Sequence, residues 1–208
     1  EGLPPKHLEP WAIDADGLWL APGFLDLHIH GDLAAARGDA VPQALQSTAS
    51  ALAARGTTAF LATTVSMAAE PLADFVRHVR TTAVSGATCL GIHLEGPWIH
   101  PQRTGAHEVA AVRPYDPREA RELVARAEGA LAMVTLAPEV PGGLDAVEEL
   151  RRAGLVVALG HSQAPPPCVD DAIRRGLTHV THLFNAMSPV HHRELGVAGM
   201  ALSDDRLT

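Results

Sequence analysis

The stretch Phe24-Leu25-Asp26-Leu27-His28-Ile29-His30 decides the fold, because it joins a strand-like apolar run to a chemical motif. Alternate side chains of a β-strand point to the same face, so both imidazoles lie on one side. Two neighbouring imidazoles can share a metal ion. By itself such a pair fits a polar strand end equally well, but the Pro22-Gly23 turn before it and Gly31 after it favour a metal site.

Five further apolar runs follow along the chain, separated by amphipathic stretches. They span residues 57–63, 89–95, 131–137, 155–161 and 178–183. This alternation predicts repeated strand-helix units on a parallel sheet, and the nearly continuous apolar runs are typical of strands covered on both faces.

The helices between the later strands carry recognisable start and stop signals. Asp116 is the expected N-cap of a helix that has Pro117 at its first position and ends near Gly129. A second helix is predicted around Leu144, Val147 and Leu150, and a third from the prolines at 165–167 to Gly176.

Six such units fit either a doubly wound sheet or a barrel, and periodicity does not separate the two. The chemically suggestive residues lie at the carboxyl ends of several different strands, which is how barrel enzymes build a site. The prediction is therefore an α/β fold in which residues 22–208 form about six of the eight units of a (β/α)8 TIM-type barrel.

The first 21 residues lack the strand-helix alternation of the rest of the chain. Asp16-Gly17 predicts the turn of a short hairpin there, which we interpret as the remnant of a small β-sandwich domain. The chain starts at Glu1 and stops after a polar stretch at 203–206, so both ends are expected to be cuts in a longer protein.

Composition narrows the classes of function. A net charge of -8 argues against a nucleic-acid surface, which needs clustered Lys and Arg. The chain has no apolar run of about 18 residues that could span a bilayer. Cys89 and Cys168 show no paired spacing, so neither a disulfide framework nor a cysteine zinc site is expected, and a cytoplasmic location fits.

Further candidate ligands close the other predicted strands. Glu95 follows His93-Leu94 at the end of the third, while His161 and His182 end the fifth and sixth. A buried carboxylate is costly without a cation or hydrogen-bond donors. Four strands that end in this way are hard to explain by packing, so a metal site at the barrel mouth is predicted.

These motifs together resemble one enzyme family. Residues 22–31 (PGFLDLHIHG), 93–97 (HLEGP), 105–107 (GAH), 159–162 (LGHS) and 181–187 (THLFNAM) occur in the order found in N-acetylglucosamine-6-phosphate deacetylases of the amidohydrolase superfamily. The last motif, followed by Arg193-Glu194-Leu195-Gly196, is the most family-specific.

The resemblance implies a metal held by Glu95, His161 and His182, with His28 and His30 available for a second ion. The expected metal is divalent, Zn²⁺ first, with Fe²⁺, Co²⁺ and Mn²⁺ as alternatives, in one or two copies.

The resemblance also implies a set of substrate contacts. His107 would polarise the acetamide carbonyl, and Asn185 with the backbone of Ala186 would face the sugar phosphate. Arg193 would bind the phosphate across the subunit interface of a homodimer. The plainer alternatives are a loop histidine for His107 and a solvated basic loop for Arg193.

The implied reaction is metal-assisted hydrolysis of the N-acetyl group, giving acetate and glucosamine-6-phosphate. In the family the general acid is an aspartate after the last barrel strand, and no such strand lies within these 208 residues, so low activity is expected of this chain alone. One alternative is a dihydroorotase-like amide hydrolase, but its fourth strand would carry a lysine, and Lys6 is the only lysine here. Another is a non-catalytic metal-binding fragment.

Overall fold

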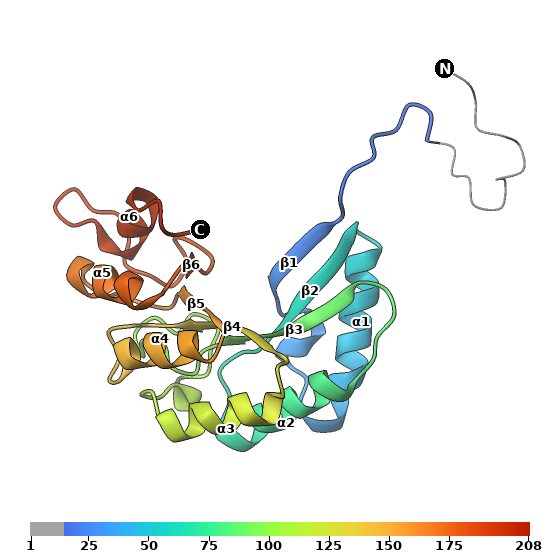
Figure 1. Cartoon of the computed structure of the whole chain (residues 1–208), viewed down its shortest axis with the longest axis horizontal. Coiled ribbons are helices and arrows are strands. Elements are labelled where there is room, and N and C mark those ends of the chain that lie inside the picture. The colour runs from blue at the N-terminus through green and yellow to red at the C-terminus, as the bar shows by residue number, and fades with distance from the viewer. Residues whose placement is uncertain (1–14) are drawn as a thin grey trace, which may run out of the picture.

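One curved parallel sheet organises the computed structural model, which describes residues 15–208 (Figure 1). Its strands lie side by side in chain order, whereas a doubly wound sheet reverses its order at a switch point. The structure thus confirms part of a barrel. The six predicted strands are present as β1 (Phe24–Ile29), β2 (Thr57–Thr63), β3 (Thr88–Glu95), β4 (Leu131–Leu136), β5 (Val156–Leu159) and β6 (His179–Val180).

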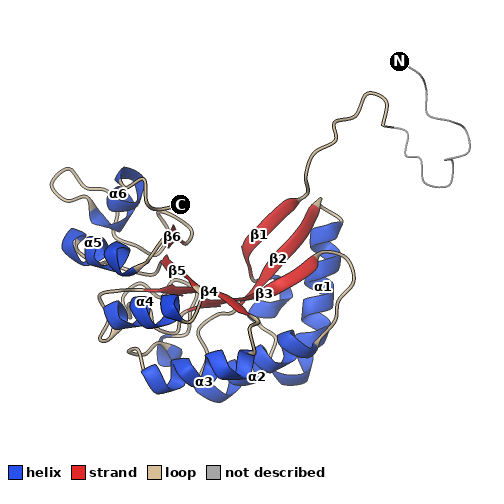
Figure 2. Cartoon of the chain, in the orientation of Figure 1, coloured by secondary structure: helices blue, strands red, loops and turns tan. Residues whose placement is uncertain are grey.

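Helices cover the outer, convex side of this sheet (Figure 2). The predicted helices are confirmed as α3, α4 and α5, and Asp116 caps α3 by accepting the backbone N–H of Arg118 at 2.8 Å. The helices are α1 (Val41–Ala53), α2 (Ala69–Thr81), α3 (Pro117–Ala127), α4 (Gly143–Arg152), α5 (Pro166–Arg175) and α6 (Gly196–Ser203), with short 3-10 helices η2 (Gly31–Ala34), η3 (Gly38–Ala40) and η4 (Val109–Ala111).

The core lies between the sheet and the helix layer. On α2, the buried Leu72, Phe75 and Val76 share one face and belong to the same apolar cluster as Phe60 of β2. Each such side chain contributes about 1.5–3 kcal/mol when it leaves water. This packing holds the strands in register, so their carboxyl ends meet at one edge.

The structure differs from the prediction at β6, which covers two residues of the predicted range 178–183. The chain leaves the strand because His182 adopts a left-handed backbone, with φ of 35°, which a strand cannot contain. The first arm of the predicted hairpin lies outside the described residues. Asp16-Gly17 does form a turn, but residues 18–20 are in no strand.

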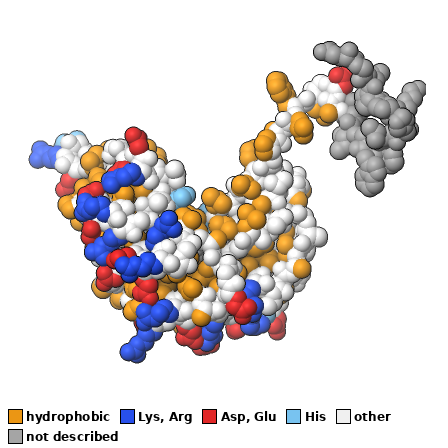
Figure 3. All heavy atoms as spheres, viewed as in Figure 1, with side chains coloured by type: hydrophobic (Ala, Val, Ile, Leu, Met, Phe, Trp, Pro, Cys, Tyr) orange, Lys and Arg blue, Asp and Glu red, His pale blue; other side chains and the backbone are white. Residues whose placement is uncertain are grey.

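The concave side of the sheet is open between β1 and β6. Within residues 15–208, β1 pairs only with β2 and leaves a free edge, whereas the outer edge of β6 bonds the backbone of Thr208 through Thr178 and Val180. Phe24, Leu25 and Leu90 are largely exposed, and apolar atoms gather along the inside of the curve (Figure 3). No helix in the described part of the chain is long and apolar enough to cross a membrane.

Candidate metal centre

Glu95, the last residue of β3, stands at the centre of a ring of imidazoles and is 2% exposed. The ring comes from the carboxyl ends of β1, β5 and β6 and from the loop after β3. Oε1 lies 2.9 Å from Nε2 of His182, 3.0 Å from that of His161 and 3.5 Å from that of His28; Oε2 lies 3.0 Å from Nε2 of His107 and 3.1 Å from that of His30. The structure therefore brings together all five predicted metal residues and His107.

The second ring nitrogens show which atoms can bind a cation. Nδ1 of His161 donates to the backbone carbonyl of Arg103 at 2.7 Å, so in the neutral ring the lone pair is on Nε2. That lone pair faces both the Glu95 carboxylate and Nε2 of His182, 3.0 Å away. His30 is oriented similarly, since its Nδ1 donates to the carbonyl of Thr63 at 3.3 Å.

Lone pairs and a carboxylate that point at one another repel unless a proton or a cation lies among them. Imidazole nitrogens with a carboxylate are the donors that suit Zn²⁺, and carbonyl acceptors on the far ring nitrogens are the usual way of orienting such ligands. His28, Glu95 and His182 each offer one ligand atom within 4.8 Å of the others. The residues present thus fit a divalent metal.

The backbone at two of these positions is strained. His161 and His182 adopt left-handed conformations, with φ of 49° and 35°. This conformation is unfavourable for residues other than glycine, and such strained residues are common at functional sites. It turns both imidazoles towards Glu95 as their strands end.

The pKa values of the metal-free ring are shifted by burial and by Glu95. Burial raises the pKa of Glu95, but the surrounding imidazoles, first among them His107 with its hydrogen bond, outweigh it and hold that pKa well below its usual range. Burial lowers the pKa of His28 to about 4, which keeps this ring neutral and able to ligate at pH 7. Burial also lowers the pKa of His182, but the hydrogen bond with Glu95 outweighs burial, so the pKa of His182 is raised.

His107 differs from the other imidazoles in the ring. Its Nδ1 accepts the backbone N–H of Ser66 at 2.8 Å, and the Ser66 hydroxyl lies at the same distance. The proton of the neutral ring is therefore on Nε2, which donates to Glu95. Although His107 is close enough to Glu95 and His161 to count among metal donors, a protonated nitrogen does not ligate. The geometry suits a hydrogen-bond donor to substrate.

Gly96 leaves the space that Ser66 occupies. Its φ is 72°, and a Cβ atom built there would come within 2.4 Å of the Ser66 hydroxyl oxygen. Glycine at this position thus allows the left-handed backbone and leaves room for the Ser66 side chain.

His93 shares the strand parity of Glu95 but is not a free ligand. Its Nδ1 donates to the carbonyl of Leu27 at 2.8 Å, and its Nε2 accepts the hydroxyl of Thr135 at 2.7 Å. Thr135 also bonds the hydroxyl of Thr181. With both nitrogens satisfied and no exposure, His93 is a polar element of the barrel interior beneath His28.

Glu139, in the loop after β4, fixes the segment that follows His161. Its two carboxylate oxygens accept the Ser162 hydroxyl at 2.8 Å and the backbone N–H of Gln163 at 2.7 Å. Neither Ser66 nor Glu139 belongs to a motif that marked it in the sequence, because each acts through a distant partner.

Apart from His107, the predicted substrate residues lie outside the imidazole ring. Asn185 is exposed on the turn that follows His182, and Ala186 is half-buried beside Gly105. Arg193 is exposed on the loop before α6, where it lines a cavity with Arg103 and Gln163. The structure therefore places the first two beside the ring and the third beyond it.

Residues 19–207 match the model of the amidohydrolase family. The chain belongs to this family. Amidohydrolases named N-acetylglucosamine-6-phosphate deacetylase from Bacillus subtilis and Homo sapiens are each 38% identical to it, over 89% and 92% of this chain and 48% of each relative.

Solved structures of deacetylases with this name are also similar to the chain. The deacetylase of that name from Mycobacterium smegmatis superposes with a TM-score of 0.79 at 38% identity, over 90% of this chain and 49% of that one. A mutant of the same enzyme was solved in complex with N-acetyl-D-glucosamine-6-phosphate, with a TM-score of 0.78 at 37% identity. The chain thus spans about half the length of the relatives it matches.

Proposed function

We propose that this amidohydrolase chain carries the metal-binding half of an N-acetylglucosamine-6-phosphate deacetylase, which hydrolyses the N-acetyl group to give acetate and glucosamine-6-phosphate. The observation that carries the proposal is the ring of imidazoles around Glu95. Relatives 38% identical to the chain bear that enzyme name, which supports this substrate.

In this proposal Glu95, His161 and His182 hold a divalent metal, with Zn²⁺ as the first choice, and His28 and His30 are available to a second ion. When bound, the metal would activate water and polarise the amide carbonyl. His107 would donate its Nε2 proton to the carbonyl oxygen as negative charge develops there. Asn185 and the backbone of Ala186 would orient the sugar phosphate. Phosphate binding by Arg193 across a homodimer, and a cytoplasmic location, stay predictions.

The test combines metal binding with product detection. The chain, freed of metal and then titrated with Zn²⁺ or Co²⁺, is expected to bind one or two ions. Proton NMR would then follow acetate release from N-acetylglucosamine-6-phosphate, with the unphosphorylated sugar and dihydroorotate as comparisons. Acetate from the phosphorylated sugar above a Glu95→Gln background supports the proposal. Dihydroorotate opening would contradict it, and bound metal with no acetate release, even from a chain extended to the length of its relatives, would favour a non-catalytic metal-binding fragment.

A further inference from the structure

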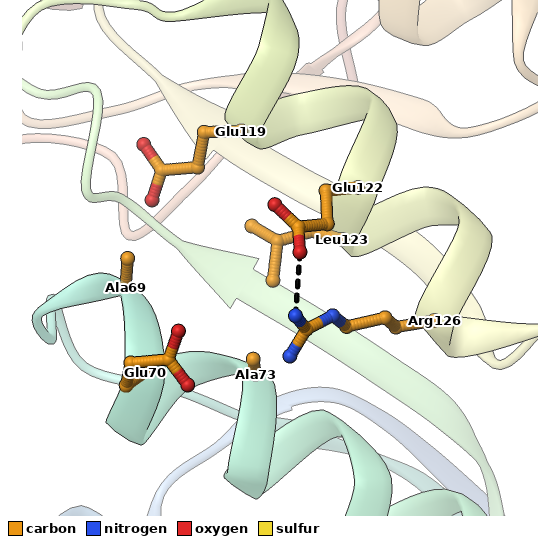
Figure 4. A pocket seen from close by; sticks show the side chains of 7 residues that line it. All are labelled: Ala69, Glu70, Ala73, Glu119, Glu122, Leu123 and Arg126. Atoms are coloured by element: carbon orange, nitrogen blue, oxygen red, sulfur yellow. Dashed lines mark hydrogen bonds and ion pairs between the residues drawn. The ribbon is translucent and has the colours of Figure 1, made fainter.

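A large cavity borders the candidate metal centre on the β5 side. Its volume is about 1020 Å³, at the upper end of the usual range for small-molecule sites. It contacts the centre through two residues. The backbone carbonyl of Arg103 orients His161, and Gln163 follows His161 by two positions. By contrast, the crevice between α2 and α3, where Arg126 pairs with Glu122, holds about 30 Å³, room for a water but not for a sugar (Figure 4).

Arg103 lines this cavity with a guanidinium that has no partner among the described residues. Its Nε atom is buried and has no hydrogen-bond partner, and within residues 15–208 its guanidinium forms no ion pair. The terminal N–H groups of this guanidinium also form no hydrogen bond within residues 15–208, so a ligand in the cavity can supply their acceptors.

The remaining charges of the cavity also favour an anion. Arg193 lines it too, and its Nε bonds the neighbouring ring of His192 at 3.1 Å rather than a carboxylate. Among the described residues that line the cavity, Glu194 is the one acid, and it pairs with neither arginine. Two guanidinium groups against one carboxylate leave the cavity with a net positive charge.

We propose that Arg103 binds the phosphate end of the substrate from within the same chain as the metal-binding residues. The planar guanidinium offers paired N–H groups that match two phosphate oxygens. One residue then serves both ends of the site, since its carbonyl orients His161 while its side chain takes the anion. The phosphomonoester as ligand rests on the proposed function, whereas anion binding by Arg103 stands on the cavity alone.

The experiment measures binding of inorganic phosphate to the metal-free chain by isothermal titration calorimetry. Arg103→Gln is compared with Arg118→Gln, which makes the same charge change at an exposed position outside the cavity. We expect Arg103→Gln to weaken phosphate affinity by about tenfold or more, as loss of hydrogen bonds to a charged group does. Arg118→Gln should change it by less than about twofold, as for other exposed charges. Unchanged affinity in Arg103→Gln would overturn the proposal.

Co²⁺ titration of Arg103→Gln separates anion binding from folding, because the backbone carbonyl that orients His161 is retained. If Arg103→Gln also loses Co²⁺ binding, Arg103→Lys is measured instead. Phosphate binding by Arg103→Lys supports the proposal, and absence of phosphate binding overturns it. A last comparison uses glucosamine-6-phosphate and glucosamine. Phosphate binding through Arg103 without added affinity for the sugar phosphate would refute the proposed substrate but leave the anion site. Sugar-phosphate binding that is unaffected by Arg103→Gln would remove Arg103 from the site.

Discussion

Ser66 sets the tautomer of His107. The backbone N–H of Ser66 donates to Nδ1 of His107 at 2.8 Å, and both residues are buried. An N–H group cannot accept a proton, so Nδ1 must carry the lone pair and the neutral ring keeps its proton on Nε2. His107 is thereby kept as a donor beside candidate ligands that present lone pairs.

Nitrogen-15 NMR of the histidine-labelled, metal-free chain should show His107 as the Nε2–H tautomer. Ser66→Ala should leave this tautomer unchanged, because the backbone N–H remains after the hydroxyl is lost. His107→Gln assigns the signal. An Nδ1–H form in the unmodified chain would contradict the hydrogen bond from Ser66 and the donor role of His107.

Gly96→Ala should destabilise the fold more than Gly129→Ala does. Both glycines have positive φ, so each substitution carries roughly 1–2 kcal/mol of backbone strain. A Cβ at Gly96 also meets the Ser66 hydroxyl, whereas one at Gly129 meets nothing within 4 Å. Urea unfolding measures the free energy of unfolding of both variants. Equal losses of stability would show that the Ser66 side chain moves aside without a measurable loss of stability.

Glu95→Gln should weaken Zn²⁺ or Co²⁺ binding by more than about 100-fold, beyond the 10- to 100-fold cost of losing even an outer-shell partner. The amide removes the negative charge at the centre of the ring. Glu108→Gln, at an exposed position, is the matched control and should bind as the unmodified chain does. Metal titration of the two proteins makes the comparison, and similar affinities would exclude Glu95 as a ligand.

The metal-free chain should lose stability as the pH falls from about 6.5 to about 4. Burial lowers the pKa of His93 from 6.5 to about 4, so in this range the unfolded chain binds a proton that the folded chain does not. The contribution of His93 is full above the unfolded pKa and is lost as the pH approaches the folded one. The largest contribution of His93 to the free energy of unfolding is about 3 kcal/mol.

Urea unfolding at several pH values tests this dependence. Because burial also lowers the pKa of His28 to about 4, His93→Gln should reduce but not abolish the slope of the stability profile between pH 4 and 6.5, while His192→Gln, at an exposed position, should leave the slope unchanged. A profile that is identical in the His93 variant and the unmodified chain would mean that another group causes the acid sensitivity.

Local signals predicted the architecture because they depend on neighbours along the chain. Apolar periodicity gave all six strands, and Asp116 with Pro117 marked the start of α3. The signals failed at β6, where the left-handed backbone of His182 ends the strand early, and α6 was not predicted. Strand parity placed the histidines and Glu95 at one edge, since parallel strands in register bring their carboxyl ends together.

The sequence by itself determined which strands bring an imidazole or a carboxylate to the barrel mouth, because residue type and position at the strand end suffice for that. Only the tertiary structure decided what each ring nitrogen does. His93 and Glu95 have the same parity, yet His93 is satisfied by Leu27 and Thr135, and Ser66 makes His107 a donor. Hydrogen-bond partners come from strands and loops about 40 to 66 residues away, and their position depends on packing, which no local pattern encodes.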